Sequence, residues 1–335
     1  MKTTTQTART TLAIAALLAL AACGGGGGSG GGSSTGAAAP ASGASTPSTT
    51  SSATSANVST PQYASGSAQS AAFTLLNQQR QQCGFPALVE NTQLDQAAAA
   101  HAKYQGLNNV VSDTEVAGNA GFTGVTYTNR AVAAGYPQSV GAGGVSEGYY
   151  TNATLTETQY GQQLIYGWEA GVYHVGGIFA PVTAAGVGES ETTFNGFPEV
   201  WADITLANLQ SMTTSSPLTF PCQGTTGLAY KASGETPTPP NTSGVWGTPV
   251  TVMGNPTDTI VLQSGSMTDT LGNVITLQLL NSTNDPNKEI QSYQGAAYPA
   301  APLSPNMTYS VSITGTVNGT AFSRNFTFTT GNIVG

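Results

Sequence analysis

The feature that most limits what this chain of 335 residues can fold into is a long segment that cannot form a core. From Gly24 to Gly66 the residues are almost all Gly, Ser, Ala, Thr and Pro. Such a segment has too little apolar surface to offset the entropy lost on ordering, so we expect a flexible tether over residues 23–66. Its glycine run has no strand before it and no helix after it, which argues against a phosphate-binding loop. The folded part should therefore lie within residues 67–335.

The first 22 residues are typical of an export signal. A basic start is followed by an apolar stretch that is too short to span a bilayer. The residues Leu20-Ala21-Ala22-Cys23 resemble a bacterial lipobox, in which Cys23 is lipidated and becomes the mature N-terminus. An ordinary signal peptide with a chance cysteine is the alternative. We expect an exported lipoprotein of the bacterial outer membrane, which faces the periplasm or the cell surface and is bound to the membrane through Cys23.

The charge of the chain limits its class of partner, and its cysteine content suggests a disulfide. The net charge is −8 with only 8 Lys and Arg residues, which argues against a nucleic-acid partner. Of the three cysteines, lipidation of Cys23 would leave Cys83 and Cys222 as a candidate disulfide pair. An oxidising compartment would permit that bond.

Residues 67–232 alternate between helix-like and strand-like patterns. Apolar spacing and capping residues predict helices over 70–82, from 92 through His101, over 128–134 and over 155–170. His101 shares one helix face with Leu94, Ala98 and Tyr104, so it should point toward the packed side of its helix. Strands are expected over 184–188 and 199–204. This first domain is expected to be α+β.

The Pro-rich residues 233–243 predict a linker, and residues 244–335 predict an all-β domain. Five runs of alternating Val, Ile, Thr and Tyr read as strands, at 248–253, 259–262, 274–280, 308–316 and 320–329. Asn318-Gly319, between two such runs, is a strong hairpin signal. The region resembles the immunoglobulin-like (Ig-like) β-sandwiches of bacterial surface proteins, which implies a spacer or an adhesive module.

Short motifs in residues 67–232 resemble the CAP superfamily of cysteine-rich secretory proteins, antigen 5 and pathogenesis-related 1 proteins. The motifs are Leu76-Asn77, Arg80, Leu88, Asn91, Leu94, Ala98, His101-Ala102, Asp113–Glu115, Gly121–Gly124, Arg130, Gly135-Tyr136, Trp168, His174, Ala180-Pro181 and Gly186–Gly188. They occur in a consistent order over roughly 160 residues. The resemblance implies an α–β–α sandwich with a central cleft that contains two His and two acidic residues.

Carried over position by position, the cleft residues would be His101, Glu115, Glu147 and His174. Ser146-Glu147-Gly148 stands where the family often has Gly-Glu-Asn, and Val175 follows His174 where Arg is common, so this sequence departs from the family pattern at the rim. Glu169, by contrast, is expected on a helix surface.

Several roles for this His/Glu group remain open. His101 and His174 could supply nitrogen ligands to a weakly bound divalent metal such as Zn²⁺, with the carboxylates beside them. The carboxylates could instead simply hold each imidazole by a hydrogen bond. The sequence has no His-Glu-x-x-His and no Gly-x-Ser-x-Gly motif, so it favours a non-catalytic role.

Three functions follow from these alternatives. The leading one is a lipid-anchored envelope or surface binding module, whose cleft presents the four residues to a metal, a small ligand or a protein. The second is a metal-dependent hydrolase that acts on peptide or cell-wall material. The third is an adhesin in which the cleft is only structural.

Overall fold

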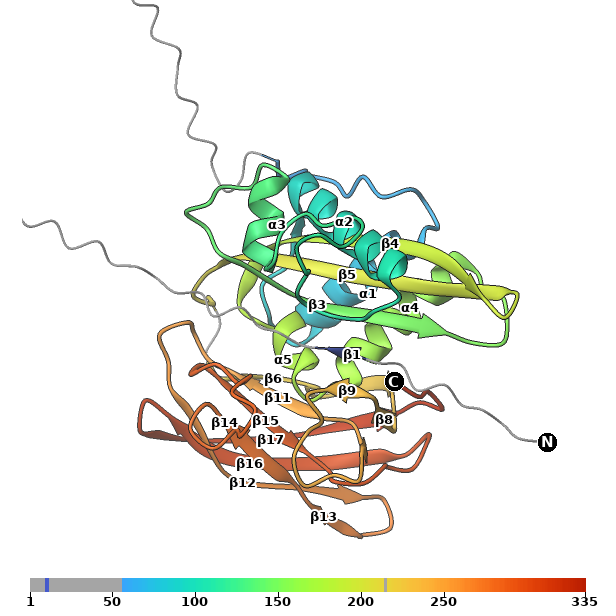
Figure 1. Cartoon of the computed structure of the whole chain (residues 1–335). Helices are drawn as coiled ribbons and strands as arrows, with labels where there is room; N and C mark the ends of the chain where they lie inside the picture. The colour runs from blue at the N-terminus through green and yellow to red at the C-terminus, as the bar shows by residue number, and fades with distance from the viewer. Residues whose placement is uncertain (1–9, 12–55, 214–215) are drawn as a thin grey trace, which may run out of the picture.

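The computed structural model describes residues 10–11, 56–213 and 216–335, and it contains two layered sandwiches packed against each other (Figure 1). Cys23 and nearly all of the predicted signal peptide lie outside the described residues. No helix among the described residues is both long enough and apolar enough to cross a membrane. The mixed architecture confirms the predicted α+β class.

The first sandwich is a four-stranded sheet with helices on both faces, in the order β2-β4-β5-β3. Helices α2 and α3 cover one face, and α1, α4 and α5 cover the other (Figure 1). The bounds of its elements are α1 Ala68–Gln82, β2 Val89–Glu90, α2 Thr92–Asn108, α3 Tyr127–Ala133, β3 Ala142–Tyr150, α4 Glu157–Ala170, α5 His174–Ile178, β4 Val182–Phe194 and β5 Phe197–Leu209.

Local capping chemistry explains where the helices begin and end. The Asn91 side chain accepts hydrogen bonds from the backbone N–H groups of Gln93 and Leu94 and so caps α2. Helix α1 ends before Gly84, whose positive φ of 82° suits glycine. Helix α3 begins before the predicted position 128, because the Thr126 side chain accepts the N-terminal hydrogen bond from the Asn129 backbone N–H.

The second sandwich contains two antiparallel-rich sheets, β14-β15-β11-β6 and β13-β12-β16-β17-β7. Their bounds are β6 Leu218–Phe220, β7 Thr225–Leu228, β11 Val250–Met253, β12 Ile260–Asp269, β13 Val274–Thr276, β14 Gln278–Asn281, β15 Gln294–Tyr298, β16 Thr308–Val317 and β17 Thr320–Thr330. Asn318 and Gly319 form the predicted hairpin turn, with positive φ values of 52° and 81°. Short pairings complete the described structure: β8 Ala232–Ser233 with β10 Val245–Trp246, and β1 Thr10–Thr11 with β9 Glu235–Thr236.

Two predicted domain limits are wrong. Strands β6 and β7 pair with β11 and β17, so the second sandwich begins near Leu218 and not after the linker at 233–243. At the other end, residues 56–66 are not part of a free tether. Asn91 Nδ2 donates to Asn57 Oδ1 at 2.7 Å, and the Tyr63 hydroxyl donates to Asp95 at 2.6 Å. We call residues 56–66 the N-terminal strap, and a soluble fragment should include it.

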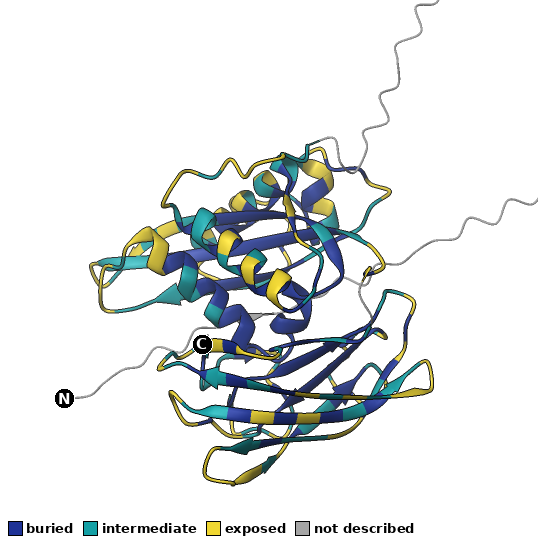
Figure 2. Ribbon diagram, turned by 180° about the vertical axis from the view of Figure 1, so that it is seen from behind, coloured by how far each residue is buried: buried dark blue, intermediate teal, exposed yellow. Residues whose placement is uncertain are grey.

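The two sandwiches share one continuous hydrophobic core. Buried residues run through the sheets of both sandwiches and through the helices between them (Figure 2). Helix α5 lies in this boundary layer, where the Phe179 and Phe220 rings stack with centroids 3.8 Å apart. The Trp246 indole N–H donates to the Ala170 carbonyl at 2.8 Å, and Gln294 Nε2 donates to the Gly176 carbonyl at 3.0 Å. The second sandwich is therefore packed firmly against the first.

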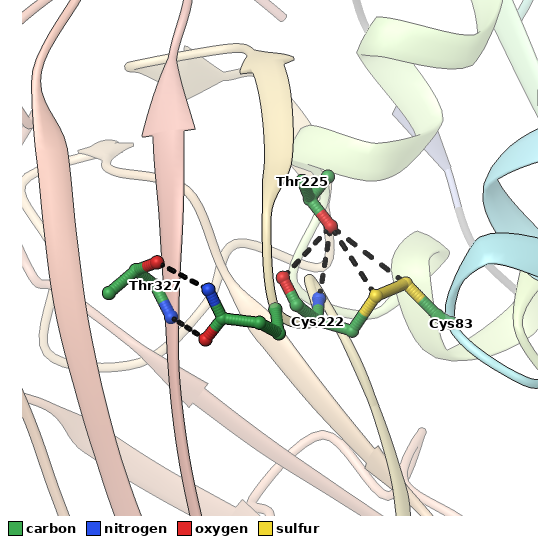
Figure 3. Close-up of a disulfide and its surroundings, with 5 residues drawn as sticks. Cys83, Cys222, Thr225 and Thr327 are labelled. Carbon is green, nitrogen blue, oxygen red and sulfur yellow. Dashed lines mark hydrogen bonds between the residues drawn. A yellow bond between two sulfur atoms is a disulfide. The ribbon is translucent and has the colours of Figure 1, made fainter.

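A disulfide joins Cys83, after α1, to Cys222, in the loop between β6 and β7 (Figure 3). The Thr225 hydroxyl lies against both sulfurs and also bonds the Cys222 backbone. This bond confirms the candidate pair and ties the two sandwiches together covalently.

Arg80 is a buried cation that donates hydrogen bonds to backbone carbonyls at the boundary between the two sandwiches. Its side chain is fully buried, and it donates to the carbonyls of Ile178 at 2.6 Å, Ala180 at 3.1 Å and Val182 at 3.0 Å. Burial lowers the pKa of Arg80 to about 9. These bonds satisfy the Ile178 carbonyl at the C-terminal end of α5 and add hydrogen bonds to the segment that leads into β4.

Candidate functional site

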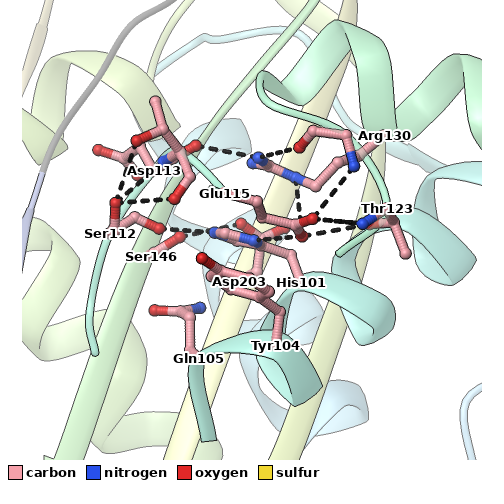
Figure 4. Close-up of polar contacts among 12 residues, drawn as sticks. His101, Tyr104, Gln105, Ser112, Asp113, Glu115, Thr123, Arg130, Ser146 and Asp203 are labelled. Carbon is pink, nitrogen blue, oxygen red and sulfur yellow. Dashed lines mark hydrogen bonds and ion pairs between the residues drawn. The ribbon is translucent and has the colours of Figure 1, made fainter. Parts of the chain in front are cut away.

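His101 lies on α2 and is completely enclosed, with 0% of its surface exposed (Figure 4). Its Nδ1 is 2.9 Å from Glu115 Oε1, and its Nε2 is 2.6 Å from the Ser112 carbonyl oxygen. A carbonyl can only accept a hydrogen bond, so Nε2 must carry a proton, and a carboxylate on the other side also accepts. Both ring nitrogens of His101 therefore face hydrogen-bond acceptors.

Glu115 is fixed from the opposite side by the loop that leads to α3. The backbone N–H groups of Thr123 and Gly124 donate to Oε2 at 2.5 Å and 3.1 Å, and the Thr123 hydroxyl adds a further bond. Burial pushes the pKa of Glu115 upward, but the hydrogen bonds from His101, Thr123 and Gly124 outweigh burial and lower it. The Glu115 side chain is therefore held as a carboxylate beside the His101 ring.

The network extends from this pair onto the sheet. Tyr127 donates to Asp113 at 2.6 Å and lies 3.0 Å from the Ser146 hydroxyl, which donates to Asp203 at 3.1 Å. Burial raises the pKa of Asp203, although the charges of His101 and Arg130 act in the opposite direction. The charges and hydroxyls form one connected buried cluster (Figure 4).

The expectation that the four predicted residues converge in one cleft is wrong. Ser146 and Glu147 are neighbours on β3, and successive strand residues point to opposite faces of a sheet. Ser146 faces Tyr127 of α3, whereas a Cβ added at Gly167 of α4 would clash with the Glu147 carboxylate. His174 lies on α5, on the same face as α4. The sheet therefore separates His101 and Glu115 from Glu147 and His174.

His174 has a different acidic neighbour, which the sequence did not indicate. Its Nδ1 is 3.4 Å from Oε1 of Glu235, a residue of the predicted linker. The Glu235 carboxylate also accepts from the backbone N–H groups of Val172 at 2.8 Å, Tyr173 at 2.9 Å and His174 at 3.1 Å. Burial raises the pKa of Glu235 to about 8, against the effect of these three donors. Glu235 thus fastens the start of α5 to the chain that leads into the second sandwich.

The described residues do not fit the expected zinc site. Both ring nitrogens of His101 face hydrogen-bond acceptors, so neither offers a lone pair to a metal. His174 lies across the sheet from it. Within the described part of the chain, no three His, Cys, Asp or Glu side chains cluster as ligands of one ion would.

Several members of the buried network were absent from the predicted set. Asp203 lies on the same face of β5 as Trp201, in a strand that is buried on both faces, and an acid in such a strand was the available signal. Glu235 stands in a Pro-rich stretch of polar residues and gave no such signal. Glu169, which was expected on a helix surface, is buried with 3% exposure.

Part of this chain is similar to known proteins. No curated protein matches the sequence. Ten solved chains match, and one of them is an outer surface protein from Borrelia burgdorferi. That match has 12% identity and a TM-score of 0.32, and it covers 42% of this chain and 92% of the Borrelia chain. A likeness this distant supports no argument about function.

The family comparison is more direct. The model of the cysteine-rich secretory protein family, CAP, matches residues 73–194, a span that runs from α1 to the end of β4. These residues hold His101, Glu115, Glu147 and His174, as the sequence resemblance implied. The chain therefore carries a CAP domain, followed by a β-sandwich.

Proposed function

We propose that this protein is an exported, membrane-anchored binding module in which the His/Glu groups of the CAP motifs are structural and not catalytic. The observation that supports this most directly is the complete hydrogen bonding of His101 in a fully enclosed position. A general base needs a nitrogen lone pair within reach of a substrate proton. His101 has no such lone pair, and no surface through which a substrate could reach it.

The hydroxyl beside this pair is equally unsuited to nucleophilic attack. Ser146 is fully buried, and its Oγ bonds Asp203 and Tyr127, with no histidine in line to accept its proton. Neither His101, the candidate base, nor Ser146, the hydroxyl beside it, therefore supports the hydrolase alternative. An adhesive or scaffolding role, in which the second sandwich spaces or presents the CAP domain, agrees better with the geometry.

Zinc calorimetry on the purified protein tests the structural role of the pair. We expect His101→Gln to leave any zinc binding unchanged, because the ring nitrogens are not ligands. The same change should lower the free energy of unfolding by about 1–3 kcal/mol, since it leaves buried partners unsatisfied. The control is Glu191→Gln, an exposed acid on β4 that should change neither quantity. Zinc affinity, or turnover of cell-wall peptides, that is lost in a folded His101→Gln protein would contradict the proposal.

Membrane anchoring through Cys23 is the second part of the proposal. The Cys83–Cys222 disulfide supports export, because such bonds persist mainly in oxidising compartments. Cys23→Ser should move the protein from the membrane fraction to the soluble fraction and abolish incorporation of a labelled fatty acid. Cys83→Ser, which removes a different cysteine, should leave the acyl label in place. Acylation that survives Cys23→Ser would refute the anchor.

A further inference from the structure

A recess opens between the two sandwiches on the face of the sheet opposite His101. It is lined by Glu147, Gly167, Gly171, Ser233, Glu235 and Trp246, among others, and its volume of about 10 Å³ has room for one water-sized particle. We propose that this recess is a binding site for a single small monovalent cation such as Na⁺.

Two glycines on one side of α4 create the recess. Gly167 and Gly171 are one turn apart, so they face the same way. A Cβ at Gly167 would clash with the Glu147 carboxylate, and a Cβ at Gly171 would lie 2.7 Å from Glu235 Oε1. The missing side chains leave room for the two carboxylates, from β3 and from the linker strand β9, to face the same small space.

The Glu147 carboxylate is the group that would be stabilised by a positive charge in this recess. Its side chain is 2% exposed, and its Oε2 has no hydrogen-bond partner among the described residues. None of the ion pairs in the described part of the chain involves it. Glu235 differs, because both of its oxygens accept backbone N–H groups. An ionised carboxylate buried without a partner is costly, so a counter-ion that fits the recess would be stabilising.

The donor set favours a monovalent ion over zinc. Carboxylate and hydroxyl oxygens suit hard cations, and one unpartnered carboxylate calls for one positive charge. Glu235, whose pKa burial raises to about 8, lines the same recess. Other titratable groups that face these carboxylates are Tyr149 on β3, which senses the charge of Glu147, and His174 on α5, which lies against Glu235. Burial raises the pKa of Glu147 well above its usual range, so a proton is the natural competitor of the cation.

Thermal unfolding in matched salts tests the site. Near pH 8 we expect the purified protein to have a Tm about 2–4 °C higher in NaCl than in choline chloride at equal ionic strength, because choline is too large for the recess. Near pH 5 the difference should disappear, since protonation of Glu147 replaces the ion. Glu147→Gln has nearly the same shape without the charge, and it should abolish the sodium effect. Glu191→Gln should keep it.

A direct measurement keeps the proposal testable if Glu147→Gln does not fold. The ²³Na NMR line of a sodium solution should broaden on addition of the natural protein near pH 8 and sharpen again near pH 5. Equal Tm values in the two salts, an unchanged sodium effect in folded Glu147→Gln, or a sodium line that the protein does not broaden would each overturn the site.

Discussion

Replacing both Cys83 and Cys222 with serine should lower the free energy of unfolding by about 5 kcal/mol. The disulfide closes a loop of 139 positions, and the loop-entropy relation for a loop of that length gives a value of this size. The bond also joins the end of α1 to the loop between β6 and β7, so its loss frees the two sandwiches to separate in the unfolded ensemble. For a protein of ordinary stability, this loss is a large part of the total free energy of unfolding.

Urea unfolding of the natural and doubly substituted proteins measures this loss. Far-ultraviolet circular dichroism reports on the secondary structure, and tryptophan fluorescence, to which the boundary residue Trp246 contributes, reports on the packing. We expect both probes to move to lower urea together, because the shared hydrophobic core still couples the two parts. Cys23→Ser is the control, and it should have no effect on either midpoint. A loss below about 1 kcal/mol would show that the bond constrains little of the unfolded chain.

The elements that the sequence predicted well are those with a strong local pattern. Helices α1, α2 and α4 have apolar spacing and capping residues within a few positions, and strands β16 and β17 are joined by Asn318-Gly319. Strand β16 has one wet face, because the exposed Ser310 and Ser312 alternate with the buried Val311 and Ile313. Each of these signals depends on residues that are close in the chain.

The failures concern contacts between residues that are far apart in the chain. Strands β6 and β7 are only three and four residues long, and their partners lie more than thirty and about a hundred positions away. Composition near Glu235 indicated a linker, yet burial against α5 makes that residue a helix cap. No local pattern could have shown either contact.

The candidate site was half predictable for the same reason. His101 and Glu115 are fourteen positions apart and meet on one face of the sheet, as the family resemblance implied. The placement of Glu147 with them failed because alternation along β3 sends Ser146 and Glu147 to opposite faces. The family resemblance supplied which residues matter, but the register of one strand decided which of them meet.

The free energy of unfolding should fall as the pH rises from about 5 to about 8, and Glu235 is one cause. Burial raises the pKa of this carboxyl to about 8, so the folded protein binds its proton more tightly than the unfolded chain does. Its contribution is therefore fully present below the unfolded pKa and is lost as the pH rises through the folded value. For a group this deeply buried, the loss should be on the order of 3–5 kcal/mol.

Other acids also contribute to the pH dependence of stability, some in the same direction as Glu235 and one in the opposite direction. Burial raises the pKa of Glu147 and Glu169 well above the usual range, and that of Asp95 to about 7, so each adds to the decline with rising pH. The lowered pKa of Glu115 opposes them, because its contribution is present above its ordinary pKa and is lost in acid. Glu115 therefore affects only the acid limb below about pH 5.

Urea titrations across this pH range, in choline chloride so that no small cation enters the recess, measure the slope. Glu235→Gln keeps an oxygen that accepts the N–H groups of α5 but cannot titrate, so its profile should be flatter by about the amount assigned to Glu235. A surface change such as Glu191→Gln should leave the slope as it is. If the natural protein were equally stable at both ends of the range, or more stable near pH 8, then Glu235 would have to be ionised at no cost. Its N–H donors and His174 would in that case outweigh the burial of the charge.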